Sequence, residues 1–140
     1  MDVQTVALFY AQLNKHNLDT LLNDIYHDAI VFEDAVHRIE GVAALSHYFT
    51  NLYQNVERCD FTVHEQHPIH NGGFLTWTMH LQHPKLRHGQ LVNVRGATHI
   101  RFQDNKVIYH RDYFDLGEML YEQLPLLGRV IRWIKQRLAQ

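Results

Sequence analysis

An aspartate and a histidine two residues apart, Asp112 and His110, are the side chains of this sequence best suited to proton transfer. They fall in residues 107–115, which are rich in β-forming residues and predict a strand. Side chains two apart on a strand share a face, so a carboxylate and an imidazole could hold a proton between them near neutral pH. The structural alternative for His110 is a half-buried histidine bonded to the backbone. For Asp112 it is an ion pair that ties strands together through Arg95, Arg101 or Arg111.

A second group of acids, Glu33 and Asp34, closes a predicted strand at residues 29–33. A carboxylate in this position is also well suited to cap a turn by accepting backbone N–H groups. The sequence leaves both roles open for Asp34, a pocket carboxylate or a turn cap.

Histidines recur at intervals of three, but their setting does not favour a metal site. On a strand, residues three apart point to opposite faces, so we expect solvated side chains. The residues concerned are His64, His67 and His70, then His80 and His83. Cys59 has no nucleophile motif around it, and no glycine-rich phosphate loop occurs. We therefore expect no metal and no organic cofactor.

The composition is that of an ordinary globular chain, with 140 residues and a formal net charge of -2. This length predicts a single domain over residues 1–140, and this charge argues against nucleic-acid binding. A lone cysteine favours a reducing compartment, and no apolar run approaches the roughly 20 residues of a membrane span. The N-terminus lacks the basic start of a signal peptide, so we expect a cytoplasmic protein.

The hydrophobic pattern predicts helices first and then an antiparallel meander, which is typical of an α+β fold. Helices are expected at residues 3–13, 18–25 and 42–55. Strands are expected at 29–33, 59–66, 74–83, 91–102 and 107–115, with turns at 26–28, 38–41 and 103–106. The tail, residues 116–140, is expected to be helical and interrupted at Pro125 and Gly128.

Three segments resemble the SnoaL-like / nuclear transport factor 2-like class. FYAQLNKHNLDTLLNDIYHDAIVFED resembles its opening helices and first strand, IEGVAALSHYFTNLY its third helix, and GATHIRFQDNKVIYHRDYFD its closing hairpin. The resemblance covers about residues 3–119 and implies a cone-shaped, curved antiparallel or mixed sheet wrapped around N-terminal helices. It also implies a homodimer through the outer face of the sheet, with residues 116–140 as a C-terminal helical extension.

The same resemblance implies which residues line the pocket of the cone. In SnoaL-like cyclases an acid near the position of Asp112 transfers protons, and among Ile108, Phe114 and Phe102 that carboxylate would be desolvated. In ketosteroid isomerases, which share the fold, an acid at the position of Asp34 is the general base. The implied catalytic residues are Asp112, His110 and Asp34. The implied ligand-binding residues are Trp77, Met79, Thr98, Phe102, Phe114 and Tyr10.

Two specific activities of the fold fit the sequence poorly. The oxyanion-hole tyrosine of ketosteroid isomerases falls on Phe9, with Tyr10 one residue away on a different helical face, and their protonated aspartate falls on Thr98. The Arg-x-Asp of the epoxide hydrolases is Arg95 followed by Ala97. Neither activity is therefore expected.

The C-terminal segment predicts a basic amphipathic helix. Its apolar stripe is Val130, Ile131, Ile134 and Leu138, and its basic residues are Arg129, Arg132, Lys135 and Arg137, beside Trp133. The favoured interpretation is packing across the mouth of the cone or in a dimer interface. The alternative is contact with an anionic membrane or a protein partner.

The sequence thus favours a protein that binds a small, largely apolar molecule. Turnover would be an isomerase-, cyclase- or dehydratase-type reaction on an apolar carbonyl or polyketide-like compound. The alternative is a non-catalytic dimeric module whose pocket is filled by Trp77, Met79 and Phe102, and which acts through its sheet face or its basic helix.

Overall fold

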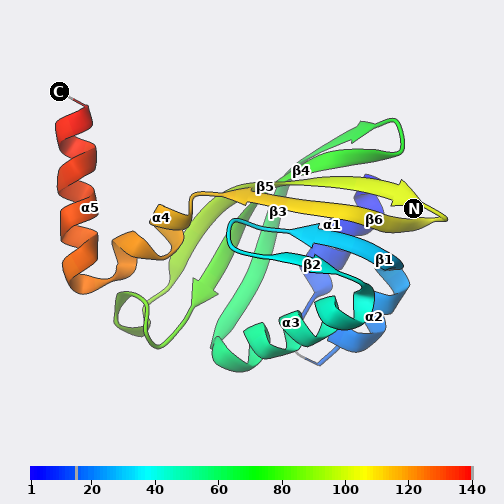
Figure 1. Ribbon diagram of the computed structural model, residues 1–140, viewed down its shortest axis with the longest axis horizontal. Helices are drawn as coiled ribbons and strands as arrows, with labels where there is room; N and C mark the ends of the chain where they lie inside the picture. The colour runs from blue at the N-terminus through cyan, green and yellow to red at the C-terminus, as the bar shows by residue number, and fades with distance from the viewer. Residues whose placement is uncertain (15, 140) are drawn as a thin grey trace.

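The computed structural model describes residues 1–14 and 16–139, and one six-stranded sheet forms its centre (Figure 1). Along the sheet the order is β2-β1-β6-β5-β4-β3. The strands are β1 (Tyr26–Glu33), β2 (Arg38–Glu40), β3 (Arg58–Ile69), β4 (Gly72–Gln82), β5 (Val92–Gln103) and β6 (Lys106–Phe114). Only the β1–β6 pair is parallel among these neighbours, so the sheet is mixed and the predicted α+β class is confirmed.

Three helices cover one face of the curved sheet: α1 (Val3–Gln12), α2 (Leu18–Ile25) and α3 (Val42–Asn55) (Figure 1). Helix α1 packs on β3 and β4, and α3 packs on β1 and α2. Their apolar faces and the inner face of the sheet form one hydrophobic core, which includes Leu22, Ile30, Leu45, Trp77 and Ile100. Lys15, in the predicted break between α1 and α2, and Gln140, the end of the predicted tail, lie outside the described residues.

The buried face of α1 includes Tyr10 and excludes Leu8. Leu8 is 56% exposed, whereas Tyr10 and its neighbour Phe9 are both buried. With about 3.6 residues per turn, Tyr10 projects between Val3 and Val6, and Leu8 projects from the opposite side. Tyr10 therefore points into the core.

Two segments predicted as turns are strands. Strand β1 begins at Tyr26, where the backbone pairs with Val107 of β6, and β2 pairs with β1 around Ile39. Neither pairing can be recognised from the local sequence, because both depend on contacts that form only in the folded sheet. The consequence for the site is that Tyr26 becomes a buried residue of the sheet.

A tight hairpin sets the register of the two strands that carry the candidate site. Asp104 and Asn105 both have positive φ, 50° and 60°, as the two-residue turn between β5 and β6 requires. The predicted turn at residues 103–106 is thus confirmed, and Gln103 pairs with Lys106. From this turn the register places Thr98 directly opposite Asp112.

The tail forms α4 (Leu116–Met119), a 3-10 turn η2 (Tyr121–Gln123) and α5 (Pro125–Leu138), whose main packing partner is η2. Figure 1 shows α5 projecting from one end of the sheet. The predicted interruption at Gly128 is wrong, because α5 runs through this glycine and needs it for close packing. A Cβ there would lie 2.4 Å from the carbonyl oxygen of Glu122. Packing of α5 across the mouth of its own cone is also wrong.

Within the described residues, no helix has both the length and the apolar character needed to cross a membrane.

Candidate functional site

A cluster of polar side chains lies in the core between α1 and the β5–β6 pair. Thr98 and His110 are the two buried polar residues of the core, with exposures of 0% and 1%. Tyr10 reaches them from α1, and Asp112 from the same face of β6 as His110. The structure therefore brings together Asp112, His110, Thr98 and Tyr10, four of the residues predicted for the site.

One oxygen of Asp112, Oδ1, is the meeting point of this cluster. It lies 2.5 Å from Thr98 Oγ1, 2.9 Å from His110 Nε2 and 3.3 Å from the hydroxyl of Tyr10. The structural alternative, an ion pair of Asp112 with an arginine, is wrong among the described residues. Arg111 contacts Glu33 instead. The immediate surroundings of Oδ1 are therefore polar, not the apolar ones expected from Ile108, Phe114 and Phe102.

A second layer of hydrogen bonds fixes the residues that contact Asp112. The indole Nε1–H of Trp77 donates to Thr98 Oγ1 at 2.7 Å, and the hydroxyl of Tyr26 lies 2.9 Å from His110 Nδ1. The indole of Trp77 thus donates to Thr98, and Thr98 donates to Asp112. The hydroxyl of Tyr10 lies within 3.3 Å of Thr98 Oγ1, His110 Nε2 and Asp112 Oδ1. With Tyr26 at Nδ1, the imidazole of His110 is held at both of its nitrogens.

Both tyrosine hydroxyls keep their protons. Burial, followed by the nearby Asp112 carboxylate, raises the pKa of Tyr10 and of Tyr26 well above its ordinary value. Each hydroxyl is therefore a permanent hydrogen-bond donor at physiological pH. The two hydroxyls contact Asp112 and His110 and help to hold them in one orientation.

Aromatic rings enclose the polar cluster. The ring of Phe61 meets Tyr10 edge-on at 5.0 Å and Trp77 edge-on at 5.2 Å, and Phe32 lies 4.8 Å from His110. Phe114 is 6.5 Å from Trp77. These rings shield the cluster from bulk solvent and leave the Asp112 side chain 14% exposed.

The remaining predicted pocket residues do not all lie near Asp112. Met79 is buried in the core, and Phe102 lines a separate pocket of about 680 Å³ at the β5–β6 hairpin end. A second pocket, of about 540 Å³, lies between α2 and α3 and includes Tyr53. Neither pocket is lined by Asp112. Phe102 therefore lines a pocket that is separate from the polar cluster around Asp112.

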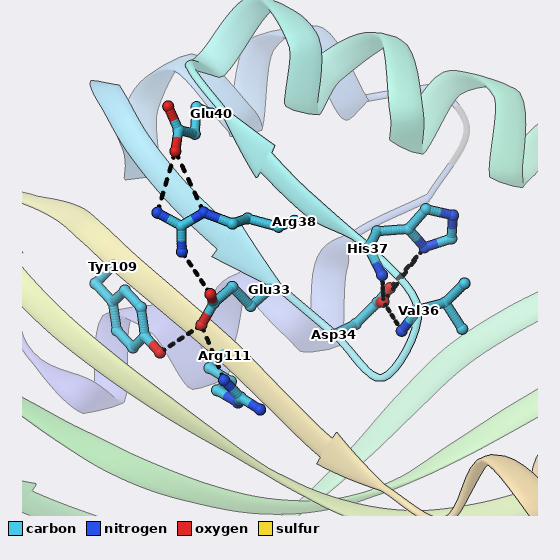
Figure 2. A network of polar contacts seen from close by, with 8 residues as sticks. All are labelled: Glu33, Asp34, Val36, His37, Arg38, Glu40, Tyr109 and Arg111. Atoms are coloured by element: carbon cyan, nitrogen blue, oxygen red, sulfur yellow. Dashed lines mark hydrogen bonds and ion pairs between the residues drawn. The ribbon is translucent and has the colours of Figure 1, made fainter.

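Asp34 is occupied by its own turn (Figure 2). Its Oδ1 accepts the backbone N–H groups of Val36 and His37 at 2.7 and 2.6 Å, and its Oδ2 accepts the hydroxyl of Tyr48 at 2.9 Å. Among the described residues it makes no hydrogen bond to Asp112 or His110. The structure therefore does not bring Asp34 together with the other two predicted catalytic residues, Asp112 and His110.

Glu33 points to the other side of the strand, into a network on the outer face of the sheet (Figure 2). It accepts hydrogen bonds from Arg38, from Arg111 at 3.1 Å and from the hydroxyl of Tyr109 at 2.8 Å. Hydrogen bonds from Tyr109 and Arg38 lower the pKa of the Glu33 carboxyl below its usual value. Glu33 thus links β1, β2 and β6.

The sequence analysis missed two residues that shape the site, Tyr26 and Phe61. Tyr26 was placed in a turn, and Phe61 was not related to the pocket. A buried tyrosine usually needs a partner for its hydroxyl, so the aromatic character of residue 26 next to a predicted strand was the available indication.

The histidines spaced by three and Cys59 do not form a second site in the part of the chain that the structure describes. In the described part of the chain, no group of three His, Cys, Asp or Glu residues is placed to hold a metal ion. His64 and His80 instead lie within 2.8 Å of the hydroxyls of Thr78 and Thr62. Burial raises the pKa of the Cys59 thiol to about 12, which makes it a poor nucleophile.

One protein family matches most of the chain. The sequence profile of the SnoaL-like domain matches residues 6–110, which run from within α1 to His110 on β6, so Asp112 lies just beyond the matched residues. This chain belongs to the SnoaL-like domain family. No curated protein sequence matches it.

Solved structures share the SnoaL-like fold at low sequence identity. A protein of Catenulispora acidiphila with a ketosteroid isomerase-like fold, in complex with trimethylamine, is 15% identical, with 85% of this chain and 89% of that one covered and a TM-score of 0.71. A candidate SnoaL-like polyketide cyclase of Shewanella denitrificans is 21% identical, with coverage of 83% and 92% and a TM-score of 0.68. TerC, co-crystallised with polyporic acid, is 13% identical, with coverage of 84% and 93% and a TM-score of 0.71. At these identities the likeness establishes the fold.

Proposed function

We propose that this SnoaL-like chain binds a small, largely apolar molecule whose polar group meets the carboxylate of Asp112. The observation that carries the proposal is the unequal use of the two carboxylate oxygens. Oδ1 is held by Thr98, His110 and Tyr10, whereas Oδ2 makes no hydrogen bond among the described residues. The side chain is partly exposed, so Oδ2 is the oxygen that a ligand would meet.

The same arrangement suits acid–base turnover. A carboxylate oriented by buried donors can take a proton from a carbon beside a carbonyl and return it elsewhere on the substrate. His110 lies 2.9 Å from the same carboxylate and is held on its other side by the hydroxyl of Tyr26. Isomerase-, cyclase- or dehydratase-type chemistry on an apolar carbonyl or polyketide-like compound uses these elements alone. The ligands named for two similar structures, trimethylamine and polyporic acid, support a small organic molecule in this fold.

A non-catalytic module is the second candidate, and the aromatic filling of the core favours it. Tyr10, Phe61 and Trp77 pack against each other next to Asp112, and the two pockets described above lie elsewhere. In that case the protein would act through the outer face of its sheet, where Tyr113 and Phe74 are exposed, as a homodimer.

The test is a thermal-shift and isothermal-titration screen of carbonyl and polyketide-like compounds against the wild type, Asp112→Asn and the control Asp24→Asn. Asp24 is exposed and lies outside the polar cluster. We expect a ligand whose affinity falls about 10- to 100-fold in Asp112→Asn, the usual effect of losing a hydrogen bond to a charged group, and is unchanged in the control. Turnover of that ligand should be lost in Asp112→Asn only.

A compound that binds wild type and Asp112→Asn equally would place the ligand elsewhere. Failure of the whole screen, together with a crystal structure in which the rings occupy the space beside Oδ2, would favour the non-catalytic module.

A further inference from the structure

Helix α5 is attached to the protein by its polar side. Gly128 packs against the backbone of Glu122, Arg132 donates to the carbonyl of Glu122 at 2.9 Å, and Lys135 lies 3.1 Å from the Glu122 carboxylate. The acids nearest to Lys135, namely Glu122, Asp115 and Glu118, are all on this side of the helix. The polar face of α5 is therefore used internally.

The apolar side of α5 consequently faces solvent. Leu126 and Leu138 are 80% and 83% exposed, and the side chains between them on this face are also exposed: Leu127, Val130, Trp133 and Ile134. Figure 1 shows the helix standing clear of the sheet along its whole length. A contiguous apolar stripe of this size on a surface helix is usual for a binding face. Among the described residues these side chains have no covering partner.

The charge of α5 indicates which partner. The helix carries four of the thirteen basic residues of the chain and none of its fifteen acidic ones, which leaves nine basic against fifteen acidic residues elsewhere. Two such helices packed face to face would bring like charges together, so a second copy is a poor partner. Arg132 and Lys135 are engaged by the attached side, whereas Arg129 and Arg137 make no ion pair among the described residues. An anionic surface complements these two charges.

Two side chains towards the C-terminal end of the exposed face, Trp133 and Arg137, suit a lipid interface. Trp133 is half exposed, and the guanidinium of Arg137 lies 5.0 Å above its ring. Tryptophan favours the headgroup level of a bilayer, and an arginine beside it can keep its charge among the phosphates while its stem contacts apolar groups. With 14 residues and about 1.5 Å per residue, α5 is about 21 Å long, which suits a helix lying in the plane of a membrane.

We propose that α5 is a membrane-surface anchor: its apolar stripe enters the headgroup region of an anionic bilayer, and Arg129 and Arg137 contact lipid phosphates. The polar side of the helix stays attached to η2, so the SnoaL-like domain sits directly above the surface. A small apolar ligand of the kind proposed above partitions into membranes, and this placement would bring the domain close to that reservoir.

The test uses the full chain with vesicles of phosphatidylcholine alone and of phosphatidylcholine with 30% phosphatidylglycerol, by co-sedimentation and tryptophan fluorescence. We expect binding to the anionic vesicles, a blue shift that disappears in Trp133→Phe, and weaker binding at high salt. Arg129→Gln with Arg137→Gln should lower the partition coefficient by about fivefold per arginine. The matched control, Lys85→Gln with Arg87→Gln, removes two basic residues from an exposed loop and should leave binding unchanged.

Ile134→Ser should also reduce binding, whereas Leu8→Ser, at an exposed apolar position on α1, should not. If the chain binds neither kind of vesicle, the proposal is overturned. Analytical ultracentrifugation then measures whether the chain is a monomer or a dimer. If it forms a dimer that Ile134→Ser dissociates, the partner of α5 is a second copy. Binding independent of Arg129 and Arg137 would overturn the anionic-lipid assignment.

Discussion

Three carboxylates within the same part of the fold have three different roles, and their contacts separate them. Asp112 receives side-chain donors in the core, Asp34 receives backbone N–H groups of its own turn, and Glu33 receives arginines on the outer face. Of the three, only Asp112 combines a fixed orientation with a carboxylate oxygen that makes no hydrogen bond among the described residues. This is why the proposed chemistry rests on one of the three acids.

The first prediction concerns Tyr26, the residue behind His110. Tyr26→Phe removes the hydroxyl that contacts Nδ1 and leaves that buried nitrogen without a hydrogen-bond partner among the described residues. We expect a loss of about 1–3 kcal/mol in the free energy of unfolding, measured by urea denaturation. Tyr121→Phe, at a half-exposed tyrosine, is the control and should change stability by less than about 0.5 kcal/mol. Equal stability of the two variants would show that the Tyr26 hydroxyl does not hold His110.

The second prediction concerns pH and Glu33. Its pKa is lowered in the folded protein, so the stabilisation that it provides is complete above its ordinary pKa of 4.5 and is lost as pH falls through the lower folded value. Glu33→Gln should therefore destabilise the protein at pH 7, and the difference between the two proteins should shrink as pH falls below 4.5. Melting temperatures of both proteins across this range measure the difference, with Glu57→Gln as an exposed control. A constant difference at all pH values would contradict the role of the ionised carboxylate.

At the scale of elements, the site depends on the close approach of β4 and β5. A Cβ on Gly96 would lie 2.3 Å from the indole ring of Trp77. This ring holds Thr98, and Thr98 holds Asp112. Gly96 on β5 thus leaves room for the ring of Trp77 on β4, and that ring positions Thr98.

The third prediction tests this relation. Gly96→Ala should displace Trp77 and cost about 1–3 kcal/mol of stability, the usual penalty for overpacking a core. In a Trp77→Phe background the same substitution should cost clearly less, because the smaller ring leaves room for the added methyl group. Urea denaturation of the four proteins in this cycle gives the coupling energy. Additive effects would mean that the two side chains do not compete for the same space.

At the scale of the whole molecule, the SnoaL-like domain and α5 are nearly independent. The helix contacts mainly η2, whereas Met119, Leu120 and Leu124 pack against the core. The fourth prediction follows from this difference. A chain ending at Leu124 should lose less than about 1 kcal/mol, because α5 buries little apolar surface. A chain ending at Asp115 also loses these three side chains and should be several kcal/mol less stable. Thermal and urea unfolding measure both, and equal losses would contradict the independence of α5.

The sequence by itself determined the elements whose signals are local. Alternation along residues 74–83, 91–102 and 107–115, the Asp-Asn turn between the last two strands and the helical spacing at 42–55 predicted the meander and its third helix. Strand parity then placed Asp112 and His110 on one face. These features depend on the covalent chain and its nearest neighbours, so a pattern in the sequence records them.

Only the tertiary structure decided what those side chains meet. Tyr10 and Tyr26 reach His110 across about 100 and 84 positions of sequence, and no local pattern encodes such a contact. The parallel pairing of β1 with β6 turned a predicted turn into a strand, and the close packing of Gly128 on η2 left the apolar side of α5 facing outward. Amphipathic spacing shows that a helix has two faces. Which face is covered depends on the energy of packing in three dimensions, and here the polar one is covered.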